Sequence, residues 1–228
     1  MNGFHWPSAG LRVIVVVGPE STGTRAFTEV LSAHPLVAGT HDAHLHGDLL
    51  DPVWEALGEG DRVEAARRMR LQSERPIVVT RRSLPHGPRP GAPAEYRRFP
   101  PLQAFLDVTA TCGRHPVVLI TTRSPLANVV SWARERSSAR NDLSAALRQY
   151  WAAYRLLFGI CAKGTFPFHM LSLEALALEG AEYVKSLFTL LGLPPTEAPL
   201  DVIQRADVNL RRYHDAWVDP PAPRADAA

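Results

Sequence analysis

The stretch VIVVVGPESTGTRAFTEVL, residues 13–31, decides the fold of this chain. Its β-branched apolar run, Val13 to Val17, is typical of a buried strand, and apolar residues then recur at helical spacing up to Leu31. Between these two segments lies the small polar loop 18–25, with the sequence GPESTGTR. A loop that leads from a buried strand into the start of a helix directs backbone N–H groups at one point, and this arrangement favours an anion.

The glycines of this loop are spaced almost as in a Walker A phosphate-binding loop. Gly18 and Gly23 let the backbone approach an anion closely, because neither carries a Cβ. Arg25 departs from the Walker pattern, and the usual lysine is missing. An ordinary turn between a strand and a helix is therefore the alternative interpretation of the loop.

Length and composition limit the classes of protein that need to be considered. The 228 residues suffice for one α/β domain, and we expect a single domain over 1–228 with loose tails at 1–10 and 220–228. Lys and Arg number 25 and Asp and Glu 23, so the formal net charge of +2 argues against a general nucleic-acid binder. Two cysteines without metal-type spacing, no signal-peptide layout and no apolar run of spanning length predict a cytoplasmic protein.

The rest of the chain alternates strands with helices. Further buried strands are expected at 77–80, 117–121 and 166–171, and helices at 61–73, 102–113, from 125 onward, at 142–161 and at 180–191. This alternation predicts an α/β fold: a three-layer sandwich with a central, mostly parallel sheet and a P-loop-like strand, loop and helix. Ligands of such sheets bind beyond the carboxyl ends of the strands, where the loops 18–25 and 121–125 are both expected.

Two further segments carry expectations about surface and core. Residues 83–101 are rich in proline and glycine and predict an irregular loop, which the arginines at 81, 82, 89, 97 and 98 make basic. Such a loop could meet an acidic acceptor or simply be solvated. The long helix 142–161 places one stripe toward the core, formed by Leu143, Leu147, Tyr150, Tyr154, Leu157, Phe158 and Cys161.

Residues 41–51 hold a group of possible metal ligands or bases: His41, Asp42, His44, His46 and Asp48. Histidine and aspartate are good ligands for zinc or iron, so a metal cluster is one interpretation. No known ligand spacing fits these residues. A pocket wall, or a general base within it, is the interpretation that we favour.

Three separate stretches, taken together, resemble the sulfotransferases that use 3′-phosphoadenosine 5′-phosphosulfate (PAPS). GPESTGTR at 18–25 is similar to the 5′-phosphosulfate loop of that family. TTRSPLANVVSWA at 121–133 is similar to its strand that ends in an arginine, followed by a helix that carries a serine. HMLSLEALALEGAEYVKSLFTLLGLPP at 169–195 is similar to its strand, acidic turn and closing helix. The likeness spans positions 13–195, and the order of the stretches makes it specific.

The resemblance implies a role for particular residues. The phosphosulfate would be cradled by Ser21, Thr22, Gly23 and Thr24, with Arg25 supplying the positive charge that the family often draws from a lysine. The 3′-phosphate would be bound by Arg123 and Ser131, and the C-terminal Arg211 and Arg212 would close over the nucleotide or form a solvated face. An arginine fork and a hydroxyl suit a phosphate chemically. Glu20 stands near a position that is basic in many members, so we expect its carboxylate to turn away or to pair with an arginine.

The general base of such an enzyme must reach the acceptor hydroxyl, and histidine or a carboxylate suits this task. Some members carry a glutamate shortly after a His-Pro pair, and His34-Pro35 places that position near His41, Asp42 or His44 here. Others carry a histidine at the end of the second strand, where His86 is close by. We expect at most one of His41, His44 and His86 to be the base.

The sequence therefore predicts sulfuryl transfer from PAPS to a hydroxyl of a carbohydrate or other small-molecule acceptor, with no metal required. A small-molecule kinase that uses ATP is the alternative, based on the Gly18 to Gly23 spacing. The missing lysine speaks against that kinase, as does the arginine that follows strand 117–121 where a magnesium-binding aspartate would be expected. A third possibility is a nucleotide-binding protein of the same fold without catalysis. Sugars, natural-product hydroxyls and phenols all remain open as acceptors, and so does the oligomeric state.

Overall fold

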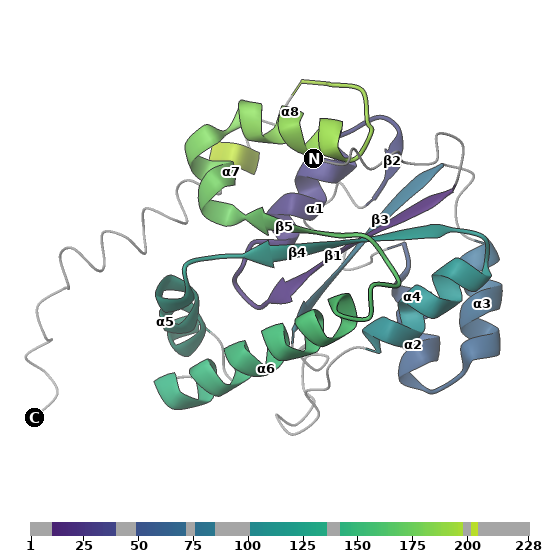
Figure 1. The fold of residues 1–228 in the computed structure, drawn as a ribbon, viewed down its shortest axis with the longest axis horizontal. Helices are drawn as coiled ribbons and strands as arrows, with labels where there is room; N and C mark the ends of the chain where they lie inside the picture. Colours follow the sequence, from purple (N-terminus) through teal and green to yellow (C-terminus); the bar gives the residue numbers. More distant parts are fainter. Residues whose placement is uncertain are drawn as a thin grey trace, which may run out of the picture.

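The computed structural model describes residues 11–39, 49–71, 76–84, 101–135, 142–197 and 202–204. Within these ranges five strands form one sheet in the order β2-β3-β1-β4-β5, and all neighbouring pairs are parallel (Figure 1). The strands are β1 (Arg12–Pro19), β2 (Val37–Ala38), β3 (Ile77–Leu84), β4 (His115–Thr122) and β5 (Phe168–Ser172). This parallel sheet with helices on both faces confirms the predicted α/β sandwich.

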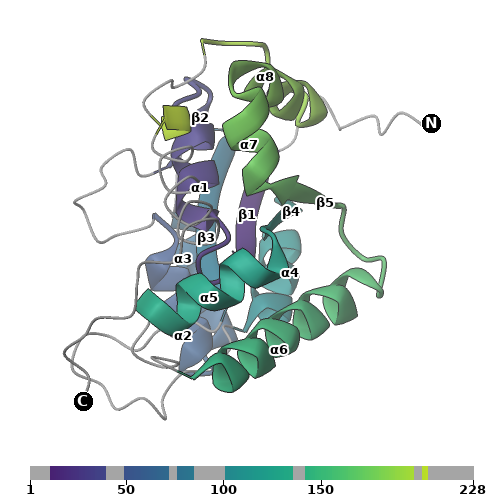
Figure 2. The same ribbon diagram turned by 90° about the vertical axis from the view of Figure 1, so that its left-hand side faces the viewer.

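Helices cover both faces of the sheet. On one side lie α1 (Thr24–Ser32), α7 (Leu173–Glu179) and α8 (Ala181–Leu190) (Figures 1 and 2). On the other side lie α2 (Asp51–Gly58), α3 (Arg62–Leu71), α4 (Leu102–Thr111), α5 (Pro125–Glu135) and α6 (Leu143–Cys161). Each layer buries its own apolar cluster against the sheet, as parallel sheets require.

The central strand β1 shows why the chain folds into three layers. Val13, Val15 and Val17 point into the cluster formed with α2 to α6. Ile14 and Val16 point to the opposite face and pack with α1 and α8. Successive side chains of a strand alternate between its faces, so an uninterrupted apolar run can serve two cores at once. All five side chains are buried.

Several elements differ from the sequence-based expectation. The sequence did not predict β2, α2 or α7, which are short. Strand β3 continues to Leu84 through polar residues, because it pairs with β1 along its whole length. Ser83 and Leu84 of the expected irregular loop therefore belong to β3, and residues 85–100 of that loop lie outside the described residues.

Arg82 was wrongly assigned to the basic loop. Its side chain is buried in β3, where Nη2 lies 2.6 Å from Oδ1 of Asp51. The guanidinium also stacks over the Trp54 ring, 4.7 Å from its centroid. The Trp54 indole in turn donates a hydrogen bond to the Thr80 hydroxyl at 3.0 Å. This cation therefore holds α2 on the sheet and does not face an acceptor.

The stripe expected on α6 is partly wrong. Tyr150, Tyr154 and Leu157 are buried as predicted. Leu143, Leu147 and Phe158 are instead exposed, at 57%, 46% and 46%. The helix needs only a narrow face to cover the sheet, and the small residues Ala146 and Ala153 supply much of that face. The apolar pattern of α6 is thus wider than the core requires.

His34 connects the end of α1 with the turn after α8. Its Nδ1 accepts a hydrogen bond from the Leu36 N–H at 3.1 Å, so its Nε2 donates to the Pro194 carbonyl at 3.0 Å. The ring is buried and meets Phe188 edge to face. We expect His34→Ala to lower the free energy of unfolding by about 2 kcal/mol, because it removes a buried ring together with its contact with Phe188 and its hydrogen bonds to the Leu36 N–H and the Pro194 carbonyl.

Urea unfolding followed by circular dichroism measures this loss. His115→Ala is the matched control, because His115 is exposed at the start of β4. An equal loss of stability in both variants would contradict the structural role of His34.

Candidate functional site

The candidate site lies where β3, β1 and β4 end side by side. The register pairs Gly18 with Ser83 across β1 and β3, and Val17 with Ile120 across β1 and β4. After β1 the chain continues into α1 on one face of the sheet, and after β4 it continues into α5 on the other face. Ligands of open parallel sheets bind at such a reversal of strand order. The loops after β1 and β4 flank this point, as the sequence predicted.

The loop 18–25 has an unusual backbone conformation. Ser21 has a φ of 67°, and Gly23 has a φ of 90°. Glycine adopts the left-handed region readily, whereas a serine there costs about 1 kcal/mol or more. Such strain is retained where surrounding contacts hold it, and alternating right- and left-handed residues turn successive N–H groups toward one point.

The start of helix α1 carries no side-chain cap. Gly23 is the N-cap residue and offers no side chain to the first N–H groups. The first N–H groups of a helix have no partner within the helix, so an anion is a natural acceptor for them. Thr24, the first residue of the helix, is buried and its hydroxyl lies 3.2 Å from the Ser83 hydroxyl at the end of β3. A hydroxyl of α1 and a hydroxyl of β3 therefore meet at the helix N-terminus.

Threonine hydroxyls fasten the middle of the loop to β4. The Thr22 hydroxyl lies 2.7 Å from the Thr121 hydroxyl and donates to the Pro19 carbonyl at 2.7 Å. The Thr121 hydroxyl also donates to the Val17 carbonyl at 3.3 Å. Both threonines are fully buried. The predicted cradle residue Thr22 thus shapes the loop, and its hydroxyl is already engaged there.

Arg123 and Asn128 hold the first part of the loop from the side of β4 and α5. Nη1 of Arg123 donates to the Ser21 carbonyl at 3.2 Å. The Asn128 amide donates to the Glu20 carbonyl at 2.7 Å. Ser131 is buried one turn after Asn128 on α5, and residues three apart share a helix face. The structure therefore brings Arg123 and the α5 face that carries Ser131 to the loop, and a phosphate site at these residues stays a prediction.

Arg25 and Glu20 are two charged residues of the loop whose contacts differ from those of a simple anion-binding cradle. Arg25 is 54% exposed and forms an ion pair with Glu29 one turn later on α1, with 2.8 Å between Nε and Oε1. The Glu29 side chain is only 14% exposed, so a phosphate bound by Arg25 would have to compete with this ion pair. Glu20 is buried, and its N–H donates to the Leu84 carbonyl at 3.3 Å. The expectation about the direction of its carboxylate stays a prediction.

Glu174 supports the loop that carries Arg123. Its Oε1 accepts a hydrogen bond from the Ser124 N–H at 2.7 Å, and its Oε2 lies 3.2 Å from the Ser172 hydroxyl. That hydroxyl caps α7 by accepting from the Ala175 N–H at 3.2 Å. In the sequence, Glu174 stands only within the stretch that resembles an acidic turn. The contact with Ser124 depends on β4 and β5 lying side by side, which local sequence does not reveal.

Five of the predicted site residues lie outside the described residues. They are the three candidate bases His41, His44 and His86 and the C-terminal arginines Arg211 and Arg212. The possible metal ligands at 41–48 lie outside as well. Conversely, the structure adds Ser83, Thr121, Asn128 and Glu174 to the site. Of these, Asn128 left a trace in the sequence as a polar residue between Ala127 and Val129.

Comparison with known proteins adds no family. A scan against models of protein families found no match, and neither did a search of curated proteins. Along the described ranges, no helix combines the length and apolar character needed to span a bilayer. The case for a function therefore rests on the geometry of the site and on the resemblance of its three stretches.

Tyr154 connects the helix α6 to this site and predicts an alkaline sensitivity. Its hydroxyl donates to the Thr121 carbonyl at 3.2 Å. Burial, with Tyr150 close by, raises the pKa of Tyr154 well above its usual value. An unfolded chain loses the tyrosine proton near pH 10, whereas the folded chain keeps it. The free energy of unfolding is therefore expected to fall as the pH rises above about 10.

Urea unfolding between neutral pH and about pH 11 tests this linkage. Tyr154→Phe loses about 1 kcal/mol at neutral pH with the hydrogen bond, but its stability should decline less steeply than that of the wild type in alkali. Parallel alkaline declines in the two proteins would show that Tyr154 does not contribute.

Proposed function

We propose that this protein is a sulfotransferase that moves the sulfuryl group of PAPS to a hydroxyl of a carbohydrate or other small-molecule acceptor. The observation that carries the proposal is that an uncapped helix N-terminus and a buried arginine lie at the same end of the parallel strands, where each would meet one anionic group of a nucleotide. One is the α1 N-terminus without a side-chain cap, and the other is Arg123, whose guanidinium lies 3.2 Å from the loop at the Ser21 carbonyl. PAPS carries a 5′-phosphosulfate and a 3′-phosphate, and it is this second group that would require Arg123 and Ser131.

The loop and helix would act mainly by positioning and by electrostatics. The acceptor oxygen attacks sulfur, the bond from sulfur to the 5′-phosphate oxygen breaks, and that oxygen takes the electron pair. Backbone N–H groups at Gly23 and Thr24 and the Arg25 guanidinium would stabilise the charge that grows on the leaving phosphate. The acceptor proton passes to a base, for which His41, His44 and His86 are the candidates by sequence. Positioning residues such as Asn128 and Thr121 would hold the loop through their bonds to Glu20 and Thr22.

Two other functions are kept as alternatives. A small-molecule kinase is favoured by the strand, loop and helix at 12–32, which is also the arrangement of nucleotide-binding P-loops. Two observations speak against a kinase. Thr24 stands where the Walker lysine would be, and Arg123 follows β4 where a magnesium-binding aspartate would be expected. A nucleotide-binding protein without catalysis is the second alternative. It is suggested by Glu20, a buried acidic residue within the loop 18–25. We further propose a cytoplasmic location, on the basis of the two free cysteines, Cys112 and Cys161.

Calorimetric titration with three nucleotides separates these functions. Adenosine 3′,5′-bisphosphate is expected to bind at least tenfold more tightly than adenosine 5′-phosphate, because only the bisphosphate reaches Arg123. Equal affinity for the two would remove the sulfotransferase proposal. Tight binding of ATP that depends on magnesium would support the kinase. Transfer of labelled sulfate from PAPS to a panel of sugars and phenols then distinguishes an enzyme from an inactive binding protein.

A further inference from the structure

Helix α6 carries a second apolar face that the core does not use. Leu147, Trp151 and Phe158 are 46%, 64% and 46% exposed. A helix advances about 100° per residue, so these three side chains lie within about 40° of one another around the axis. Next to them around the helix axis lie Arg148, Ala152 and Arg155, which are also exposed. We name these six residues the basic–apolar surface.

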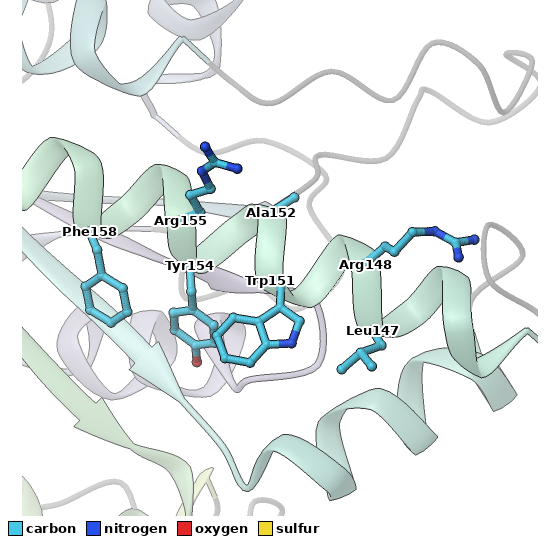
Figure 3. A pocket seen from close by; sticks show the side chains of 7 residues that line it. All are labelled: Leu147, Arg148, Trp151, Ala152, Tyr154, Arg155 and Phe158. Atoms are coloured by element: carbon cyan, nitrogen blue, oxygen red, sulfur yellow. The ribbon is translucent and has the colours of Figure 1, made fainter.

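Figure 3 shows how the two halves of the surface are arranged. Leu147, Trp151 and Phe158 project from one side of α6 together with Tyr154, and Arg148, Ala152 and Arg155 project from the other. The same residues line a shallow hollow along the helix. Trp151 stands between the arginines along the helix, three residues after Arg148 and four before Arg155. The face therefore combines a ridge of large apolar side chains with an adjoining row of fixed positive charge.

The charged side chains that line the hollow, Arg148 and Arg155, have one sign, whereas Asp142 caps the start of α6 and Glu174 lies near Tyr154. No aspartate or glutamate occurs from residue 143 to residue 173, whereas Arg148, Arg155 and Lys163 fall within that stretch. The edge strand β5 also exposes apolar side chains, with Phe168 and Met170 at 42% and 50%. A soluble protein rarely leaves large apolar side chains together on its surface without a use for them. The two arginines, without an acidic residue in the lining of the hollow, indicate that the partner is negatively charged.

We infer that the basic–apolar surface docks the protein on an anionic phospholipid membrane. Tryptophan is suited to the boundary between headgroups and acyl chains, and arginines beside it would meet lipid phosphates and carboxylates. A second copy of this chain is a poorer occupant, because a two-fold interface would bring Arg148 and Arg155 of both copies together. The helix is 19 residues long, lies along the outside of the sheet and would rest on the bilayer without crossing it. The inference does not depend on the proposed sulfuryl transfer.

Vesicle flotation tests the docking surface directly. The full chain is mixed with vesicles of phosphatidylcholine alone, or of phosphatidylcholine with about one third phosphatidylserine, in low salt and in about 0.5 M salt. We expect binding to the phosphatidylserine vesicles, loss of that binding in high salt, and little binding to phosphatidylcholine. Arg148→Gln with Arg155→Gln should weaken the binding about tenfold or more, since each arginine near an anionic surface contributes substantially. Trp151→Ala should weaken it several-fold.

Matched control variants remove the same kinds of side chain, two arginines and one apolar residue, from other parts of the protein surface. Arg62→Gln with Arg70→Gln deletes two exposed arginines of α3, and Leu178→Ala deletes an apolar side chain of α7 that is 84% exposed. These controls should bind vesicles as the wild type does. All substituted residues are exposed, and the urea midpoint of each variant verifies that it is folded. As a second readout, the blue shift of tryptophan fluorescence on adding phosphatidylserine vesicles should largely disappear in Trp151→Phe.

Three results would overturn the inference. The first is that the wild type binds neither kind of vesicle and does not bind polyglutamate. The second is that the α6 and α3 arginine variants lose binding equally, which would indicate attraction by net charge alone. The third is that the wild type ignores vesicles but forms a salt-sensitive complex with polyglutamate, which would assign the surface to an acidic polypeptide.

Discussion

Gly18→Ala is expected to lower the free energy of unfolding by about 3 kcal/mol or more, and to disturb the loop 18–25 in any protein that still folds. A Cβ on residue 18 would lie 2.1 Å from the Thr121 hydroxyl, 2.6 Å from the Thr22 hydroxyl and 2.8 Å from the Thr121 carbonyl oxygen. The carbonyl belongs to the paired strand β4 and cannot swing aside. The conflict must therefore be relieved by moving β1, β4 or the loop.

Urea unfolding of two further variants makes this result specific. Gly159→Ala is the matched control, because a Cβ there meets nothing within 4 Å. Alanine in the interior of a helix should stabilise the protein by about 0.5–1 kcal/mol. Adding Thr121→Ala to Gly18→Ala removes the closest atom and should restore part of the lost stability. Wild-type stability in Gly18→Ala would show that the loop and β4 are not packed as closely as described.

Arg123→Ala is expected to weaken the binding of adenosine 3′,5′-bisphosphate about 10- to 100-fold, if the proposed function is correct. The magnitude follows from charged hydrogen bonds between an arginine and a phosphate, which contribute about 1.5–3 kcal/mol each. Adenosine 5′-phosphate lacks the 3′-phosphate, so its affinity should change much less. The comparison of the two nucleotides matters because Arg123 also donates to the Ser21 carbonyl at 3.2 Å. Loss of that hydrogen bond alone would disturb the loop and weaken the binding of both nucleotides alike.

Calorimetry on three proteins separates these effects. Arg123→Lys keeps the charge but loses the planar fork, so it should bind the bisphosphate with an affinity between those of the wild type and Arg123→Ala. Arg70→Gln, on the distant helix α3, should bind as the wild type does. An equal loss of affinity for both nucleotides in Arg123→Ala would make this arginine a purely structural support of the loop. The 3′-phosphate site would then have to be abandoned.

The sequence by itself determined the class of fold and the place of the candidate site. The buried run from Val13 to Val17 can be satisfied only inside a sheet covered on both faces, because its side chains alternate between two apolar layers. Glycines at 18 and 23 and the arginine at 123 marked the ends of two strands before any pairing was known. These signals are local, since they depend on a strand, a turn and the residue that follows.

Only the tertiary structure decided how the site is held and which surfaces remain outside. Arg81 and Arg82 looked like loop residues until pairing of β3 with β1 drew them into the sheet. Thr22 meets Thr121 across 99 positions of sequence, and Ser124 meets Glu174 across 50. No local pattern encodes such distant partners, because they depend on which strands become neighbours. For the same reason, the stripe on α6 could not be divided by sequence into the part that covers the sheet and the part that is left exposed.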